Sequence, residues 1–335
     1  EKLTMHISQN TGLFMVLFTT FLWGSWSQFI KKIGKWPIAA FMLWLYIAGF
    51  AVTSVSMIFL KSIFVPEGIA TLVRAMPQKC LLVFVCGATF AAGVQINMMV
   101  VSKAGLIFST SIMAMLSIPV GCTVSSFFGG IPENVSVLQI VLGVALLVTA
   151  TLLCQKATRM RDRDTREFSQ DGEKARLRYM LILLVCAVVF APTYTLALSI
   201  GTRTEGGKTL PTVLLVWILS AGSLVGTALV SGVRLSRARQ WGEFAARRNL
   251  RYIGYACLSG LFHYGGNLIH TIASPVVSVA IAWPLGYLSN IWQYFWGIVT
   301  GEFAGSGRRA KALLAGGMGL FVAGVAWLSL ARCGI

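Results

Sequence analysis

Ten hydrophobic stretches, each about long enough to cross a lipid bilayer, follow one another along this chain of 335 residues. An α-helix needs roughly 20 mainly apolar residues to cross the bilayer, and it satisfies all of its backbone hydrogen bonds internally. Only 12% of the residues are charged, against about 25% in soluble proteins. The sequence therefore predicts an all-α membrane protein with ten transmembrane helices, over residues 12–30, 37–60, 81–101, 106–128, 135–154, 180–200, 211–231, 252–273, 276–299 and 312–330.

Basic residues are concentrated on one side of the predicted bundle. If the ten spans alternate in direction, 21 of the 28 Lys and Arg residues fall on one side and seven on the other. Cytoplasmic connections of membrane proteins carry an excess of Lys and Arg. We therefore expect an integral protein of the cell (inner) membrane with both termini outside the cytoplasm. We interpret the net charge of +17 as a consequence of this topology, with the basic residues attracted to membrane lipid headgroups. No nucleic acid is expected as a partner.

A shift of 173 residues superposes several landmarks of the chain without a gap. The matched pairs are Gly87 and Gly260, Gly93 and Gly266, Gly143 and Gly316, Lys35 and Lys208, and Gly34 and Gly207. Such self-similarity indicates an internal duplication. Each half then holds five spans, and because five is odd the second half must be inverted relative to the first. The sequence thus predicts two inverted five-helix repeats, residues 1–155 and 179–335, joined by a basic cytoplasmic linker at 156–178.

All 11 acidic residues lie in or at the edges of the connections between the spans. Intramembrane carboxylates are common proton and cation relays, so such a relay is not expected here. A membrane-embedded transferase, the alternative of another class, would need paired acids for Mg²⁺ and diphosphate or a His with a nearby Asp. We therefore expect no enzyme activity, no cofactor and no metal site.

The residues expected to line a binding site are uncharged, and they are polar or aromatic. His263, Asn267 and His270 share one face of span 252–273, because they are spaced at i, i+4 and i+7. Trp283, Tyr287 and Asn290 repeat this spacing in the next span, although Asn290 has tethering to a neighbouring helix as an alternative role. Amides, hydroxyls and aromatic rings suit a neutral polar solute. The candidate substrate-binding residues are Trp23, Trp26, Gln28, Asn97, His263, Tyr264, Asn267, Trp283, Tyr287 and Asn290.

Coupling and gating residues follow from two further residue types. His263 and His270 are the candidates for proton coupling, because histidine titrates near neutral pH. A neutral histidine bonded to a neighbouring helix is the alternative, and Na⁺ could instead bind the carbonyls of a broken helix. Pro119, Pro192 and Pro284 each free a backbone carbonyl and permit a kink, so they are candidate gating points.

Short motifs add a family resemblance. Gly301-Glu302, followed by a Gly-rich last span, resembles the Gly-Glu element and closing helix of the drug/metabolite transporter superfamily, whose members have ten spans in two five-span repeats. Trp23-Gly24-Ser25-Trp26 with Lys35-Trp36, and the segment from Gly260 to Asn267, resemble elements of its glucose, rhamnose and plant ureide permease branch.

The resemblance implies a secondary transporter. It would be a permease for a small neutral polar solute such as a sugar, nucleoside or ureide, working by alternating access as an H⁺ or Na⁺ symporter or by facilitated diffusion. Export of amino acids or amphipathic drugs and metabolites, which the wider superfamily also performs, is the alternative.

Overall fold

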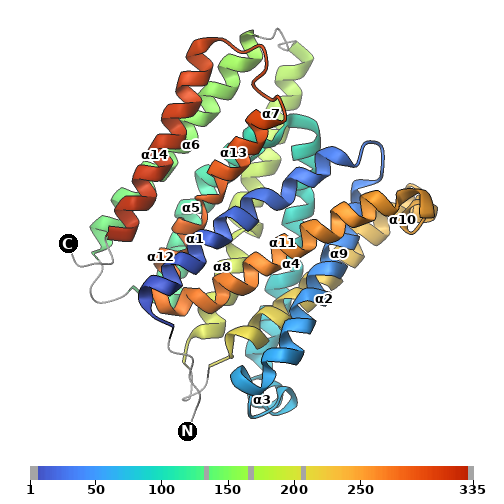
Figure 1. Ribbon diagram of the computed structural model, residues 1–335, viewed down its shortest axis with the longest axis vertical. Helices are drawn as coiled ribbons and strands as arrows, with labels where there is room; N and C mark the ends of the chain where they lie inside the picture. Colours follow the sequence, from blue (N-terminus) through green and yellow to red (C-terminus); the bar gives the residue numbers. More distant parts are fainter. Residues whose placement is uncertain (1–6, 132–135, 165–169, 205–208, 331–335) are drawn as a thin grey trace.

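The computed structural model describes residues 7–131, 136–164, 170–204 and 209–330, and all the regular structure within these ranges is helical. The long helices run side by side as a single bundle (Figure 1). The α-helices are α1 Gln9–Ser25, α2 Ile38–Phe64, α3 Ile69–Ala75, α4 Pro77–Ala104, α5 Leu106–Gly129, α6 Val137–Asp164, α7 Gln170–Val185, α8 Pro192–Thr202, α9 Thr212–Arg237, α10 Trp241–Phe244, α11 Leu250–Val277, α12 Val279–Gly286, α13 Ser289–Val299 and α14 Arg308–Leu330. A 3₁₀ turn (η1, Trp26–Lys32) extends α1, a π turn (η2, Cys186–Phe190) joins α7 to α8, and a 3₁₀ turn (η3, Arg247–Asn249) precedes α11.

Eight helical segments among the described residues are long and apolar enough to cross a membrane. They are Gln9–Lys32, Ile38–Phe64, Pro77–Ala104, Leu106–Gly129, Val137–Asp164, Leu177–Thr202, Thr212–Arg237 and Arg308–Leu328. These segments confirm the all-α class, and the chain is an integral membrane protein with helical spans.

Two predicted spans are not in this set. The prediction of span 252–273 identified a real helix, α11, but its histidines, asparagine and glycines make it too polar to qualify by composition. The predicted span over 276–299 divides into two shorter helices, α12 and α13. Pro284 has no N–H to continue the helical hydrogen-bond ladder, and α12 ends two residues later at Gly286.

The helices α6 and α7 both extend into the predicted linker at 156–178. The first ends at Asp164 and the second begins at Gln170, so residues 156–164 and 170–178 are helical. The part of the predicted linker at 165–169 lies outside the described residues.

Close backbone contacts place α9 between α2 and α4, and α11 against α2 and α1. A Cβ atom built on Gly222 of α9 would lie 1.9 Å from the carbonyl oxygen of Phe84, and one built on Gly87 of α4 would lie 2.1 Å from that of Leu219. The Ser223 hydroxyl donates a hydrogen bond of 2.9 Å to the Gly87 carbonyl across the same contact. Small residues are therefore required here, as in other tightly packed membrane helices.

The contact geometry repeats at the 173-residue shift. Gly87 of α4 meets the carbonyl of Leu219 on α9, and its equivalent Gly260 of α11 meets the carbonyl of Leu45 on α2, one residue from the equivalent of Leu219. Gly105, between α4 and α5, has φ +89°, and Ser278, between α11 and α12, has φ +78°. These two left-handed positions are also 173 residues apart.

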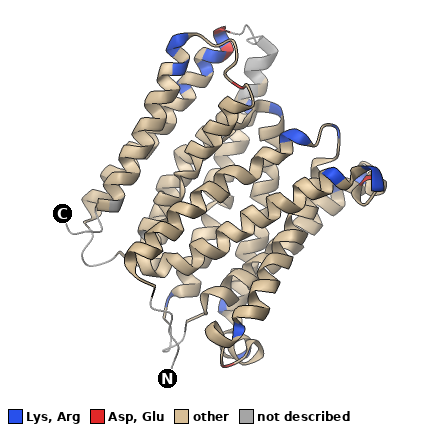
Figure 2. Ribbon diagram, in the orientation of Figure 1, with Lys and Arg blue, Asp and Glu red and all other residues tan. Residues whose placement is uncertain are grey.

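Lys and Arg residues gather at one end of the bundle (Figure 2). They surround the end of α6, the beginning of α14, the end of η1 and the turn around α10. The opposite end carries few basic residues, among them Lys61, Arg74 and Lys79. The uneven charge expected from the sequence is thus present on the folded molecule.

The α4–α9 contact gives a prediction for stability. Gly222→Ala puts a methyl group against the Phe84 carbonyl, and the resulting overpacking is expected to cost about 1–3 kcal/mol. The measurement is the melting temperature of the purified protein in detergent. Gly316→Ala on α14 is the control, because a Cβ atom added there would have nothing within 4 Å. If the melting temperature of Gly222→Ala equals those of the control and the wild type, the close contact is incorrect.

Candidate functional site

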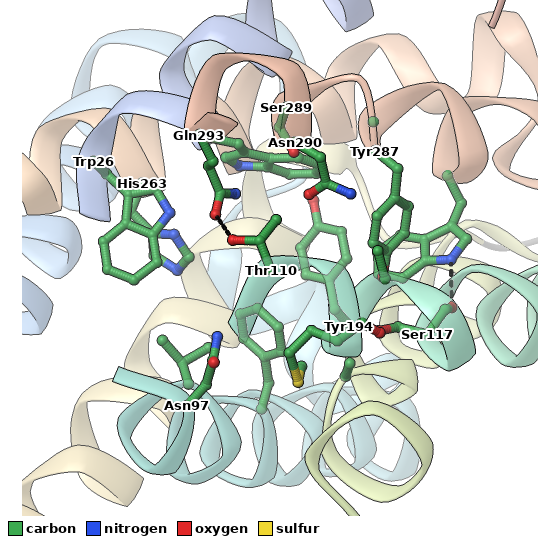
Figure 3. Close-up of a pocket in the computed structure, with 18 of the residues that line it drawn as sticks. Trp26, Asn97, Thr110, Ser117, Tyr194, His263, Tyr287, Ser289, Asn290 and Gln293 are labelled. Carbon is green, nitrogen blue, oxygen red and sulfur yellow. Dashed lines mark hydrogen bonds between the residues drawn. The ribbon is translucent and has the colours of Figure 1, made fainter. Parts of the chain in front are cut away.

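A cavity of about 170 Å³ lies among helices from both halves of the chain (Figure 3). Its wall is formed by Trp23, Trp26, Phe90, Val94, Asn97, Thr110, Met113, Ala114, Ser117, Ala191, Tyr194, His263, Asn267, Trp283, Gly286, Tyr287, Ser289, Asn290 and Gln293. None of these lining residues is Lys, Arg, Asp or Glu. The wall is therefore uncharged, aromatic and rich in amide and hydroxyl groups.

The two halves contribute equivalent positions to this wall. Six pairs of lining residues are separated by 173 residues: Phe90 and His263, Val94 and Asn267, Thr110 and Trp283, Met113 and Gly286, Ala114 and Tyr287, and Ser117 and Asn290. The first pair is in direct contact, with ring centroids 6.1 Å apart and an interplanar angle of 7°. The cavity thus lies where the corresponding surfaces of the halves meet.

The structure brings eight of the ten predicted substrate-binding residues to this one cavity. They are Trp23, Trp26, Asn97, His263, Asn267, Trp283, Tyr287 and Asn290. They come from α1, η1, α4, α11, α12, α13 and the turn between the last two.

Gln28 and Tyr264, the other two predicted residues, do not line this cavity. Tyr264 follows His263 directly, and because successive residues on a helix point about 100° apart, its side chain leaves α11 in a different direction. The Tyr264 ring packs instead on Gly49 of α2, where an added Cβ atom would lie 2.2 Å from the Cδ2 atom of the ring. Gln28 is buried in the 3₁₀ turn η1 and does not reach the cavity wall.

The two intramembrane histidines have different surroundings. His263 is 4% exposed and faces the cavity, and neither ring nitrogen has a hydrogen-bond partner among the described residues. His270 lies behind Trp23, with ring centroids 4.7 Å apart. Its Nδ1 is 3.2 Å from the Tyr194 hydroxyl and 3.1 Å from Ser274 Oγ, and its Nε2 is 3.3 Å from the Ala282 carbonyl oxygen. His270 is therefore bonded to its neighbours, whereas His263 is open to a solute.

Aromatic rings form a continuous part of the wall. The Trp26 ring lies 4.9 Å from His263, and Tyr194 lies 5.7 Å from Trp23 and 6.0 Å from Trp283, measured between ring centroids. These rings are packed on one another, so they present rigid faces to the cavity. Such faces suit the C–H surface of a sugar or the plane of a heterocycle.

Three hydrogen bonds hold polar side chains in place around the cavity. Trp23 Nε1 donates to Asn267 Oδ1 at 2.9 Å, Thr110 Oγ1 donates to Gln293 Oε1 at 2.6 Å, and Trp283 Nε1 donates to the Ser117 carbonyl at 3.3 Å. The last two bonds are drawn in Figure 3.

Other polar atoms at the cavity lack partners among the described residues. They are both ring nitrogens of His263, Nδ2 of Asn267, Nδ2 of Asn290 and Oδ1 of Asn97. A buried polar atom without a partner costs about 1–3 kcal/mol, so water or a solute is required to satisfy these atoms. The cavity can accordingly donate and accept several hydrogen bonds without providing a charge.

The candidate gating prolines take three different positions. Pro119 lies inside α5, which continues through it. Pro192 is the first residue of α8 and follows the π turn of η2. Pro284 lies beside the cavity residue Trp283, just before the break between α12 and α13.

A polar cluster around Glu302 lies at the basic end of the bundle. Its carboxylate accepts hydrogen bonds from the backbone N–H groups of Leu106 (2.9 Å) and Ile107 (3.1 Å) at the beginning of α5. The same carboxylate forms an ion pair with Lys31 of η1, and the Glu302 carbonyl accepts a 3.1 Å hydrogen bond from Arg161 of α6. This cluster joins four segments, and it gives the Gly301-Glu302 motif a structural role.

Several cavity residues were missing from the predicted set, among them Phe90, Thr110, Met113, Ser117, Tyr194, Ser289 and Gln293. A signal for three of the polar and aromatic ones was present in the sequence. Moving His263, Trp283 and Asn290 back by 173 residues points to Phe90, Thr110 and Ser117.

The chain shares its fold with a protein of known structure. No protein family matches it, and no curated protein sequence is similar to it. It resembles a solved crystal structure of a protein, with a TM-score of 0.61 and 16% sequence identity. The similarity covers 96% of this chain and 98% of the other. At this identity the similarity shows a shared fold alone.

The cavity can be tested by chemical labelling. Ser117 and Ser223 are both buried, but Ser117 lines the cavity and Ser223 lies in the α4–α9 contact. On a background with the seven native cysteines replaced, Ser117→Cys should react with a small methanethiosulfonate reagent, and Ser223→Cys should not. Mass spectrometry of the intact protein measures the added group. Equal labelling of the two variants would show that the cavity is no more accessible than the core.

Proposed function

We propose that this protein is a secondary transporter that moves a small neutral polar solute, such as a sugar, nucleoside or ureide, by alternating access. The observation that carries the proposal is the uncharged cavity in which four lining side chains have unsatisfied polar atoms. A charged solute would lose its hydration there without gaining a counter-charge, which is costly in a low-dielectric environment. A neutral solute with several hydroxyl, amide or ring-nitrogen groups would satisfy the wall.

The proposed architecture is ten spans in two inverted five-helix repeats. In it, α11 is the eighth span and the broken pair α12–α13 is the ninth. Support comes from the six lining pairs and the two left-handed turns at the 173-residue shift, and from the pair of glycine contacts, whose carbonyl partners match this shift to within one residue. Interrupted helices beside a central site are typical of transporters built from inverted repeats. This organisation supports the proposed relation to the drug/metabolite transporter superfamily and its glucose, rhamnose and ureide permease branch.

The proposed orientation places the basic end in the cytoplasm and both termini outside it. It is supported by the excess of Lys and Arg at the end of the bundle that contains η1, α10 and the beginning of α14. A cysteine placed at Lys61 checks this orientation, because a membrane-impermeant reagent should label it on intact cells. If the site is protected from the reagent, the proposed orientation is wrong.

Alternating access needs a closed end and points at which helices can bend. In the proposed mechanism, the Glu302 cluster seals the basic end, and the breaks at Pro192 and at α12–α13 absorb the movement of one repeat against the other. Opening of the basic end separates Glu302 from the beginning of α5. The solute then meets the same lining residues from the other side of the membrane.

The substrate class is tested by thermal-shift and uptake measurements with the purified protein. Neutral sugars, nucleosides and ureides should raise its melting temperature, while amino acids and cationic lipophiles should not. Asn290→Ala is expected to weaken solute binding about two- to tenfold, the value of one or two uncharged hydrogen bonds. Gln28→Ala, a buried amide away from the cavity, is the control. Stabilisation by cationic lipophiles alone would support the exporter alternative instead.

Proton coupling, if transport uses it, should depend on His263 rather than on His270. His263→Gln keeps a hydrogen-bonding group at the cavity but removes titration. This variant should lose solute accumulation against a gradient and retain downhill exchange, whereas His270→Gln should retain both. Uptake into proteoliposomes with and without a pH gradient provides the measurement. If both variants accumulate solute with the pH dependence of the wild type, coupling through histidine is wrong and Na⁺ symport or facilitated diffusion is the better account.

A further inference from the structure

A second pocket, of about 450 Å³, lies at the basic end of the bundle and shares no residue with the central cavity. It is formed by the connection between η1 and α2, the turns around α10, and the beginning of α11. Its lining residues are Lys35, Trp36, Pro37, Arg239, Gln240, Gly242, Glu243, Arg248, Asn249 and Tyr252.

Indole hydrogen bonds hold the outer wall of this pocket in place. Trp36 Nε1 donates to the Glu243 carbonyl at 2.9 Å, and Trp44 Nε1 donates to the Phe244 carbonyl at 2.8 Å. The Trp44 and Phe244 rings are stacked, with centroids 5.1 Å apart. The α10 turn is therefore attached to the first half of the chain, and the pocket is already formed without a ligand.

The charges in the pocket do not balance. Glu243 forms an ion pair with Arg248 and accepts a 2.9 Å hydrogen bond from Asn249, a side chain that is 5% exposed. Hydrogen bonds from Asn249 and Arg248 lower the pKa of Glu243, so it stays ionised and offsets Arg248. Lys35 and Arg239 are exposed, and neither has an ion-pair partner in the part of the chain that the structure describes. Two positive charges are left to attract an anion.

Arg239 occupies a position that normally belongs to glycine. Its φ of +54° lies in the left-handed region, where a side chain is disfavoured. Its N–H bonds the Ser236 carbonyl at 3.1 Å, and the next N–H, of Gln240, bonds the Leu235 carbonyl at 2.8 Å, which is the arrangement that ends a helix in a glycine. An arginine held in strained backbone at a pocket is a signal of function rather than of stability.

We propose that this pocket binds a phosphate-bearing anion, with the phosphate group held by Lys35 and Arg239. The Trp36 and Tyr252 rings, stacked with centroids 6.0 Å apart, form the floor beside these charges. Aromatic rings and basic side chains meet in this way at the level of lipid headgroups. The phosphate belongs either to the headgroup of an anionic phospholipid or to a free phosphate compound, and the site is separate from the proposed transport cavity.

The left-handed backbone supplies a variant that removes the charge without harming the fold. Arg239→Gly deletes the guanidinium and relieves the backbone, so its melting temperature without ligand should equal or exceed that of the wild type. Lys35→Gln removes the other charge. Arg237→Gln is the control, because Arg237 is an exposed arginine at the end of α9 that does not line the pocket.

The experiment uses the delipidated full-length chain in detergent. Native mass spectrometry measures binding of phosphatidylglycerol, with phosphatidylcholine for comparison, and thermal shift measures binding of inorganic phosphate. We expect Arg239→Gly and Lys35→Gln each to weaken anion binding about fivefold, the effect of one basic residue near a membrane surface. Arg237→Gln should bind as the wild type does.

The outcomes separate the two sources of phosphate. Selective binding of phosphatidylglycerol, lost in the two pocket variants, identifies a lipid site. Stabilisation by inorganic phosphate, lost in the same variants, identifies a site for a free phosphate compound. Unchanged binding in both pocket variants, or an equal loss in Arg237→Gln, would overturn the proposal, because attraction would then be spread over the whole basic surface.

Discussion

The cost of leaving a polar group without a partner away from water governs this structure at every level. Helices satisfy the backbone, and serine and threonine hydroxyls mostly bond carbonyls, as Ser223 does with Gly87. At the central cavity, the side chains of His263, Asn267 and Asn290 keep polar atoms without a partner among the described residues. Water or a solute in the cavity can satisfy these atoms.

The same constraint explains why the regular helices are interrupted where they are. At Pro192 and Pro284 the backbone loses a donor, and the chain uses a π turn in one case and a helix break in the other. The second interruption adjoins the cavity, where carbonyls freed from the helix can meet polar groups instead of lipid. Long uninterrupted helices, such as α2 and α9, lie outside the cavity wall and supply the close packing that supports it.

The basic end of the bundle and its central cavity differ in their use of charge. At the basic end, Glu302 ties the beginning of α5 to Lys31 and Arg161, and the α10 turn is fixed by the indoles of Trp36 and Trp44. Charges can be used there because water and headgroups lie within reach. The central wall, by contrast, is uncharged among its lining residues, so recognition of a solute rests on shape, stacking and neutral hydrogen bonds.

The sequence by itself determined the helical membrane class, the uneven basic charge and eight residues of the uncharged wall, because hydropathy and i, i+4 spacing are local properties. It also predicted the 173-residue repeat. That shift leads from His263 to Phe90, a cavity residue that was not a candidate by residue type. Only the tertiary structure decided which neighbour faces the cavity, placing His263 there and turning Tyr264 onto Gly49, and covering His270 with Trp23. It also decided the pocket at Arg239, whose residues come from segments about 200 positions apart. These features depend on which helices meet and at what rotation, and that is set by side-chain packing between distant segments.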